Sequence, residues 1–192
     1  SYGRADFRTP QLDRLASQGT RFTQGYSIAP ICTPTRVGLM TGRYPARHPL
    51  GLREPLTLSP EDLQRGLEPV PPTLPALLKQ AGYTTGLFGK WHLGPRPRFH
   101  PNRHGFDEFF GPLGGAVDYV SHEGPDGLHD LYRNGDRVRP QGYLTDLIAD
   151  EAVRFVRSSR EPFFLSHQGT APHSPWQRRG DPPVKRIGPS AE

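Results

Sequence analysis

The chain has 192 residues, which fits one ordinary domain or a part of a larger one. Hydrophobic residues make up only 33% of it, and 22 glycines and 23 prolines are abundant, a mixture that favours a loop-rich α/β enzyme over a compact helical bundle. No apolar run approaches the length of a membrane-spanning helix, so the sequence predicts no membrane span. Because the chain begins at Ser1, we expect the natural start of translation to lie upstream, and neither a leader sequence nor the single cysteine indicates a localisation.

The charge balance is basic, with 24 lysines and arginines against 19 acidic residues and a net charge of +5. The arginine excess is concentrated in two stretches, Arg96, Arg98 and Arg103, and then Arg133, Arg137 and Arg139. These stretches lack the interleaved aromatic residues of a single-strand binder and no nucleic-acid motif is present, so we expect no nucleic-acid partner. Three interpretations stay open: solvated loops, a surface for polyanions, and arginine-lined access for an anionic substrate.

The first predicted elements are a helix and a β-prone segment. Residues 9–17 carry apolar side chains at helical spacing, with Thr9 as the cap and Gly19 as the stop. Residues 20–26 are β-prone and are predicted to be extended. From there the chain leads through a proline-containing segment into its single cysteine.

The single cysteine, Cys32, precedes a second predicted helix. Thr33 is the expected N-cap of this helix and Pro34 its first helical residue. Cys32 is therefore expected just before a helix N-terminus, where free N–H groups and the helix dipole favour negative charge. A small reactive side chain at an anion site, with Arg36 one turn further on, indicates chemistry, although a lone cysteine is also common as a buried apolar residue.

The middle of the chain is expected to alternate between loops and short elements. A loop rich in Pro and Gly runs from residue 44 to about residue 71. Residues 73–82 are predicted to form a helix, because their leucines recur at helical spacing and a glycine ends the pattern. Residues 83–89 follow as a buried strand, which delivers the Lys-Trp-His sequence at 90–92 at its C-terminal end.

The last third of the chain contains the longest predicted helix. We place no element in residues 94–140, where loops dominate. Residues 143–158 carry the apolar pattern of a long amphipathic helix, and residues 162–167 are predicted to be a second buried strand. A loop with His173 follows this strand, and the polar, proline-rich residues 177–192 are expected to contain no element.

The order of the predicted helices and strands indicates an α/β fold with a mostly parallel sheet. Ligands of such sheets bind beyond the carboxyl ends of the strands, which is where Lys90, His92 and His173 are expected. Side chains alternate along a strand, so Lys90 and His92 are expected on one side, where they can bind an anion and donate a proton. A surface lysine beside a packed histidine, and a structural histidine in a proline-rich loop, are the alternatives. The other histidines show no ligand spacing for a zinc site: His48, His100, His104, His122, His129 and His167.

Two motifs of this chain resemble the signatures of a known family. Cys-Thr-Pro-Thr-Arg at 32–36, followed by Leu-Met-Thr-Gly-Arg-Tyr-Pro at 39–45, resembles the first signature of the sulfatases. Gly-Tyr-Thr-Thr-Gly-Leu-Phe-Gly-Lys-Trp-His-Leu-Gly at 82–94 resembles the second. The likeness extends to residues 9–16, 105–107 and the Pro-His-x-Pro at 172–175, so it covers nearly the whole chain.

This resemblance implies a modified nucleophile. Cys32 is expected to be converted after synthesis to formylglycine, an aldehyde whose hydrate offers one hydroxyl to attack sulfur and a second to expel sulfate. By the same resemblance, Arg36 holds the modified residue, Lys90 binds the sulfate and His92 handles protons at the second hydroxyl. His173 is expected either to protonate the leaving alcohol or to bind the sulfate together with Lys90.

The resemblance also implies a divalent cation, usually calcium, with hard oxygen ligands. Cys32, as formylglycine, is its only expected contact in this chain, because an acidic pair is expected upstream and an Asp-Asn pair downstream. Residues 1–192 are thus expected to be a partial N-terminal sulfatase catalytic domain, with the first strand and the C-terminal part missing. The implied fold is the alkaline-phosphatase-like α/β fold, a mostly parallel sheet flanked by helices. Three residues are further candidates for shaping the substrate pocket: Asp118, Tyr119 and His122.

The favoured function is hydrolysis of sulfate esters, with a small aryl sulfate, a sulfated sugar or a polysaccharide as substrate. The implied protein partner is the maturation enzyme that generates formylglycine. Two alternatives stay open. One is a phosphonate or phosphate ester hydrolase, because relatives with this cysteine motif act on phosphorus; the other is an inactive polyanion-binding protein or truncated fragment.

Overall fold

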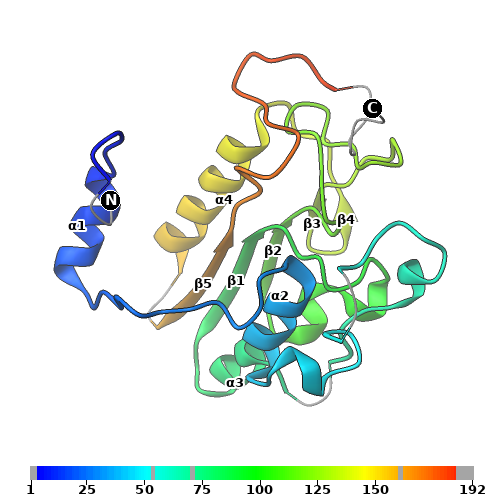
Figure 1. Cartoon of the computed structure of the whole chain (residues 1–192), viewed down its shortest axis with the longest axis horizontal. Coiled ribbons are helices and arrows are strands. Elements are labelled where there is room, and N and C mark those ends of the chain that lie inside the picture. The colour runs from blue at the N-terminus through cyan, green and yellow to red at the C-terminus, as the bar shows by residue number, and fades with distance from the viewer. Residues whose placement is uncertain (1–3, 53–54, 70–71, 160–161, 185–192) are drawn as a thin grey trace.

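A computed structural model describes residues 4–52, 55–69, 72–159 and 162–184 (Figure 1). Their α-helices are α1 (Pro10–Gln18), α2 (Cys32–Thr41), α3 (Leu74–Gln80) and α4 (Leu144–Ser158). Their strands are β1 (Thr84–Gly89), β2 (Glu108–Gly111), β3 (Tyr132–Arg133), β4 (Asp136–Arg137) and β5 (Phe163–Gln168). Short 3₁₀ helices are η1 (Pro45–Arg47), η2 (Asp62–Gln64), η3 (Pro97–Phe99) and η4 (Pro101–His104). The predicted helices at 9–17, 73–82 and 143–158 are confirmed, as are the strands at 83–89 and 162–167.

The five strands form one sheet in the order β4-β3-β2-β1-β5. Strand β1 lies between β2 and β5 and pairs in parallel with both of them. The β3–β4 hairpin adds two antiparallel strands at one edge. The predicted mostly parallel α/β sheet is therefore confirmed for the three strands that carry the site, since their carboxyl ends lie at the same edge.

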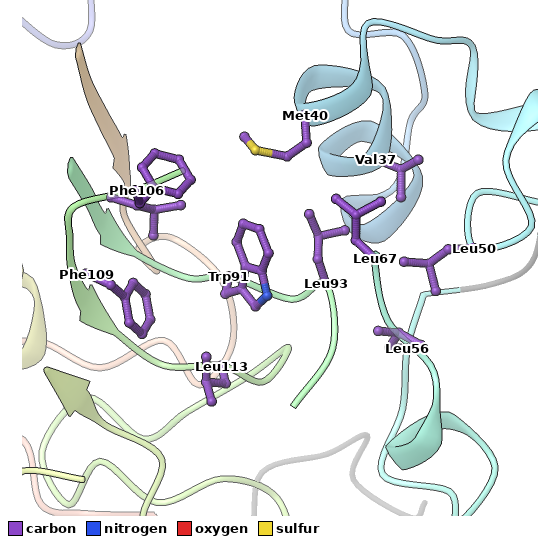
Figure 2. Packing of buried hydrophobic residues seen from close by; sticks show 11 residues of the cluster. Val37, Met40, Leu50, Leu56, Leu67, Trp91, Leu93, Phe106, Phe109 and Leu113 are labelled. Carbon is purple, nitrogen blue, oxygen red and sulfur yellow. The ribbon is translucent and has the colours of Figure 1, made fainter. Parts of the chain in front are cut away.

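The face of the sheet toward α2 carries one of two hydrophobic clusters. Leu87 of β1 and Phe109 of β2 point to this face, where they join Val37 and Met40 of α2 (Figure 2). Trp91 lies in the same cluster, 1% exposed, and its indole N–H donates to the Phe99 carbonyl at 2.9 Å. A buried Trp contributes about 3–5 kcal/mol to stability when compared with Ala. The residue between Lys90 and His92 is thus a core anchor rather than a site residue.

The opposite face of the sheet carries the second cluster. Phe88 and Phe110 are the chain neighbours of Leu87 and Phe109, and they point the other way because side chains alternate along a strand. They pack against α4, where Phe88 and Phe155 have ring centroids 5.3 Å apart. Helix α4 lies along this face of the sheet (Figure 1).

Several predictions about local structure are wrong. Residues 20–26 form turns and coil with exposed side chains, because no neighbouring strand lies beside them in the described structure. Strand β2 and the β3–β4 hairpin lie within residues 94–140, where no element was expected; β2 is four residues long, too short for a clear alternation. Strand β5 was expected to be buried but is half-buried, since it occupies an edge of the sheet. Helix α1 contains no buried residue and lies apart from the sheet (Figure 1).

Candidate active site

Cys32 is the first residue of α2 and is half-buried. The expected start of this helix was two residues later, with Thr33 as the N-cap, and this detail is wrong. Ile31 occupies the cap position with no side-chain hydrogen bond, while Thr33 is fully buried inside the first turn. The main expectation is confirmed, because Cys32 lies at a helix N-terminus, where unpaired N–H groups favour negative charge.

Lys90, Trp91 and His92 form the start of a buried loop, residues 90–94, which we call the Lys-Trp-His loop. Its backbone continues the hydrogen bonding of the sheet on both sides of β1. The Lys90 N–H donates to the Gln168 carbonyl at the end of β5, and the Trp91 N–H donates to the Pro112 carbonyl after β2. The two chains approach so closely that a Cβ on Gly89 would lie 1.9 Å from the Gln168 oxygen. The loop is therefore held by the sheet itself.

Two side chains of α2 fasten the helix to this loop. Arg36 donates from Nη1 to the Lys90 carbonyl at 2.6 Å, and Thr33 donates from Oγ1 to the His92 carbonyl at 3.2 Å. Thr33 Oγ1 also accepts from the Leu56 N–H at 3.2 Å. These two contacts join residues that are 54 and 59 positions apart in sequence, and they bring Lys90 and His92 to the N-terminus of α2, where Cys32 lies.

Lys90 and Arg36 place two cationic side chains beside Cys32. Lys90 is 4% exposed, and burial lowers the pKa of its amine to about 8; the charge of the nearby Arg36 lowers this pKa further, whereas the Cys32 side chain opposes the shift. Burial likewise lowers the pKa of Arg36 to about 10. Burying these positive charges away from water costs free energy, and an anion bound beside them offsets that cost.

His92 is a neutral, buried histidine. It is 5% exposed and has φ of 56°, so the backbone has already left the extended conformation of β1. The alternation of side chains along a strand, from which we expected Lys90 and His92 on one side, therefore does not apply here; the turn of the backbone at His92 sets the direction of its side chain. Burial first, and then the charge of Lys90, lower the pKa of His92 to about 3. Its Nε2 is 2.8 Å from the Leu56 carbonyl, which favours the tautomer with the proton on Nε2 and a free lone pair on Nδ1.

His173 approaches the same site from the loop after β5, residues 169–176, which we call the His173 loop. It is exposed, and its Nδ1 is 2.9 Å from the Ser174 carbonyl oxygen. A small pocket is lined by Lys90, Gly115, Tyr119 and Thr170 together with His173. A Cβ on Gly115 would lie 2.6 Å from His92 Nε2, so the absence of a side chain there leaves room for the imidazole. Cys32, Arg36, Lys90, His92 and His173 thus converge on one place.

Metal ligands are scarce in the described part of the chain. No group of three or more His, Cys, Asp or Glu side chains there is arranged to hold a metal ion. The residues present do not make a calcium site, and Cys32 as a metal contact stays a prediction.

Two of the three candidates for shaping the pocket have structural roles instead. Asp118 is 1% exposed and accepts hydrogen bonds from four groups, among them the backbone N–H of Val184 and the side chain of Gln177. His122 is also buried and packs against His129, with ring centroids 5.8 Å apart. These two residues hold neighbouring segments of the chain together, and neither of them lines the pocket.

Sequence reasoning missed the residues that hold the loops of the site. Asp130 accepts from the backbone N–H groups of Leu113 and Gly114 at 3.0 and 2.8 Å, which fixes the turn that lies against His92. Burial raises the pKa of its carboxyl, against the effect of these two bonds. Leu56 supplies both an N–H and a carbonyl to the site. No local pattern marks either residue, because their partners lie in other segments.

The arginine stretches are mostly engaged within the protein. Arg96 and Arg98 donate to the carbonyls of Leu63 and Gln64. Arg133 pairs with Glu151, and Arg137 donates to the Tyr132 hydroxyl. These contacts favour the interpretation of structural surface loops over a dedicated polyanion surface.

A sequence model of the sulfatases matches residues 1–188, nearly the whole chain. The chain belongs to the sulfatase family. It is 37% identical to the N-acetylgalactosamine-6-sulfatase of Rattus norvegicus over 196 residues, a match that covers 91% of this chain and 36% of the rat protein. The resemblance carried by the motif around Cys32 and the motif around Lys90 is therefore confirmed. The chain spans about a third of the length of this relative.

Solved structures show the same fold. The crystal structure of Ps i-CgsB matches with a TM-score of 0.80 and 36% identity, covering 93% of this chain and 43% of that one. A protein in complex with its substrate D-glucosamine-2-N,6-O-disulfate matches with a TM-score of 0.70 and 29% identity, covering 92% and 32%. The predicted alkaline-phosphatase-like α/β fold is thereby confirmed. Among the described helices of this chain, none has the length and apolar character to cross a membrane.

Proposed function

We propose that the protein containing this chain hydrolyses sulfate esters at the site around Cys32. The observation that carries the proposal is the convergence of Cys32, Arg36, Lys90 and His92 at the N-terminus of α2, with His173 on the same pocket. Family membership alone does not name a working site. This arrangement supports the proposed site, because a candidate nucleophile, two cations and two groups able to carry protons lie near one another.

The nucleophile in this proposal is Cys32 after conversion to formylglycine. The conversion is a two-electron oxidation of Cβ by the maturation enzyme: the C–S bond breaks and the sulfur leaves as hydrogen sulfide, a carbonyl oxygen takes its place, and the two electrons pass to that enzyme's external oxidant. Once hydrated, the modified side chain supplies one hydroxyl that attacks sulfur as the ester S–O bond breaks, and a second hydroxyl whose deprotonation drives release of sulfate. Cys32 suits this role, since it is half-buried at a helix N-terminus and contacts Lys90.

The two cationic side chains bind and orient. Lys90 donates to the sulfate oxygens, where negative charge increases as the S–O bond breaks, and a buried cation is most effective there. Arg36 is anchored through Nη1 to the Lys90 carbonyl, while its buried Nε has no hydrogen-bond partner among the described residues. That free N–H can hold the modified Cys32 in place.

The two histidines are the proposed proton carriers. His92 Nδ1 is buried and without a partner among the described residues, so its lone pair can accept the proton of the second hydroxyl. His173 is exposed and lines the pocket, so it can protonate the leaving alcohol or contact the sulfate. A neutral base and a solvent-facing acid are the two proton carriers that a hydrolysis needs.

Calcium enters this proposal only as a requirement of the family in general. The described residues do not make its site, and no step is assigned to it. We propose that its oxygen ligands come from other parts of the protein and that the modified Cys32 contacts it.

The substrate we propose is a sulfated carbohydrate. The relatives support this class, because one is named an N-acetylgalactosamine-6-sulfatase and another is bound to a disulfated glucosamine. His173 and most of its loop are exposed, so we propose that the sugar extends from the small pocket toward solvent at this loop. The formylglycine-generating maturation enzyme is the second proposed partner.

The test is to express the full-length protein with its maturation enzyme and to analyse the tryptic peptide that ends at Arg36. We expect a peptide in which the CH2–SH group of Cys32 has become an aldehyde or its hydrate, together with hydrolysis of an aryl sulfate. Cys32→Ala should abolish that activity while the protein stays folded. Full sulfatase activity with unmodified Cys32, or in the alanine variant, would refute the proposed nucleophile.

A further inference from the structure

Tyr119 joins three segments of the chain beside the pocket. It is 2% exposed, and its hydroxyl donates a 2.6 Å hydrogen bond to the carbonyl of His173. Its backbone N–H donates to Gln177 Oε1 at 2.8 Å, and its own carbonyl accepts from the Leu144 N–H at 2.8 Å. Tyr119 also lines the pocket that Lys90 and His173 share. One buried residue thus connects the start of α4, the pocket and the His173 loop.

Gln177 ties down the chain just after the His173 loop. Its side chain donates from Nε2 to Asp118 Oδ2 at 2.8 Å and to the Pro182 carbonyl at 3.0 Å. Its backbone carbonyl accepts from the Tyr143 hydroxyl at 2.8 Å. The C-terminal end of the loop is therefore fixed independently of His173.

The hydrogen bonds inside the His173 loop are local. The His173 N–H donates to the Thr170 carbonyl at 2.9 Å, and the imidazole contacts the neighbouring Ser174 carbonyl. Such bonds keep the shape of a loop but do not place it relative to the sheet. The hydrogen bond from Tyr119 comes from outside the loop, so it sets where His173 stands relative to Lys90.

We propose that Tyr119 is a positioning residue for His173. The proposal rests on the proposed function, in which His173 protonates the leaving alcohol or contacts the sulfate. Tyr119 acts through the His173 backbone: its hydroxyl holds the carbonyl, and the imidazole is thereby kept over the pocket. Without this bond the loop samples more positions, and fewer of them place the imidazole at a bound ester.

A double-mutant cycle in the full-length, matured protein tests this role. His173→Ala should lower kcat for a sulfated sugar by about a hundredfold, the order expected for loss of a general acid. Tyr119→Phe should lower kcat by up to about tenfold, the order expected for one lost hydrogen bond, with little change in KM. In the His173→Ala background the same Tyr119→Phe change should have almost no effect, because the two residues act together. An equal loss in both backgrounds would overturn the proposal, since it would mean a direct or merely structural role.

Tyr143→Phe is the matched control. Its hydroxyl also donates to a backbone carbonyl of this segment, at Gln177, but it lies outside the pocket lining. We expect Tyr143→Phe to leave kcat within about twofold of the unsubstituted protein while lowering the melting temperature as much as Tyr119→Phe does. A loss of kcat as large as that of Tyr119→Phe would contradict a specific role for Tyr119.

Amide hydrogen exchange gives a readout that does not depend on activity. Tyr119→Phe should speed exchange in the peptide that contains His173, and Tyr143→Phe should do so less. If the matured protein hydrolyses no sulfate ester, the proposed function fails, and the exchange result still decides whether Tyr119 holds the loop. Unchanged exchange in Tyr119→Phe would overturn the positioning role.

Discussion

The Lys-Trp-His loop and the His173 loop border the same pocket but are held in different ways. The first continues the hydrogen bonds of β1, with N–H groups bonded to the ends of both neighbouring strands, and its Lys90 and His92 side chains are buried. The second follows an edge strand, its histidine is exposed, and side chains such as Tyr119 hold it. The Lys-Trp-His loop is thus held by several backbone hydrogen bonds that act together, whereas the His173 loop depends on individual side-chain hydrogen bonds, each of which can be removed by one substitution.

This difference matches two different tasks. The sulfate group is the same in every sulfate ester, so the residues proposed to bind it can be rigid and buried, where their charges act most strongly. The alcohol differs from one substrate to another, so the residue proposed to serve it lies on a loop whose position depends on a few contacts. Substitutions in the first loop should therefore cost far more activity than substitutions around the second.

The largest effect is expected for Lys90→Ala. Removing the buried ammonium leaves the sulfate oxygens without their main cation, and we expect kcat/KM for sulfate esters to fall by about a thousandfold or more. Lys79→Ala is the control, because Lys79 is an exposed lysine on α3 that pairs with Asp107 away from the pocket. Near-normal turnover by Lys90→Ala would refute the assigned role of the rigid loop.

A smaller loss is expected for Gly115→Ala. The added methyl group would lie 2.6 Å from His92 Nε2, so the imidazole has to move. A displacement of this kind costs about a hundredfold in rate when it occurs next to the reacting atoms. Gly135→Ala is the matched control, since a Cβ there meets no neighbour within 4 Å. Full activity of Gly115→Ala in a steady-state assay would show that the position of His92 is not critical.

The smallest effect is expected for Thr33→Val, measured as stability. This nearly isosteric change removes the Oγ1 that bonds to the His92 carbonyl and the Leu56 N–H, and it should lower the free energy of unfolding by about 1–3 kcal/mol because buried groups are left unpaired. Thr41→Val, near the end of α2, removes a bond to the Val37 carbonyl and is expected to cost less. Urea unfolding measures both. Equal stability of Thr33→Val and the unsubstituted protein would mean that α2 is attached to the loop by other contacts.

Local sequence was enough to predict most regular elements and the motif residues of the site. Apolar spacing identified α4, which buries one face over several turns, and β1, which is buried along most of its length. The same spacing identified the short α3, although Pro75 is its only buried residue. It failed for residues 20–26, whose β-prone side chains meet no partner strand, and for the four-residue β2, whose two phenylalanines point to opposite faces.

What the sequence by itself determined is the set of candidate reactive groups: a single cysteine ahead of an arginine, a lysine and histidine after a strand, and a histidine in a proline-rich loop. Only the tertiary structure decided how these groups are held. Thr33 proved to be a buried link rather than a helix cap, and Tyr119, Leu56 and Asp130 support the site from distant segments. The physical reason is that a motif reflects the residues a reaction needs, whereas a hydrogen bond between segments exists only after the chain has folded and brought both partners together.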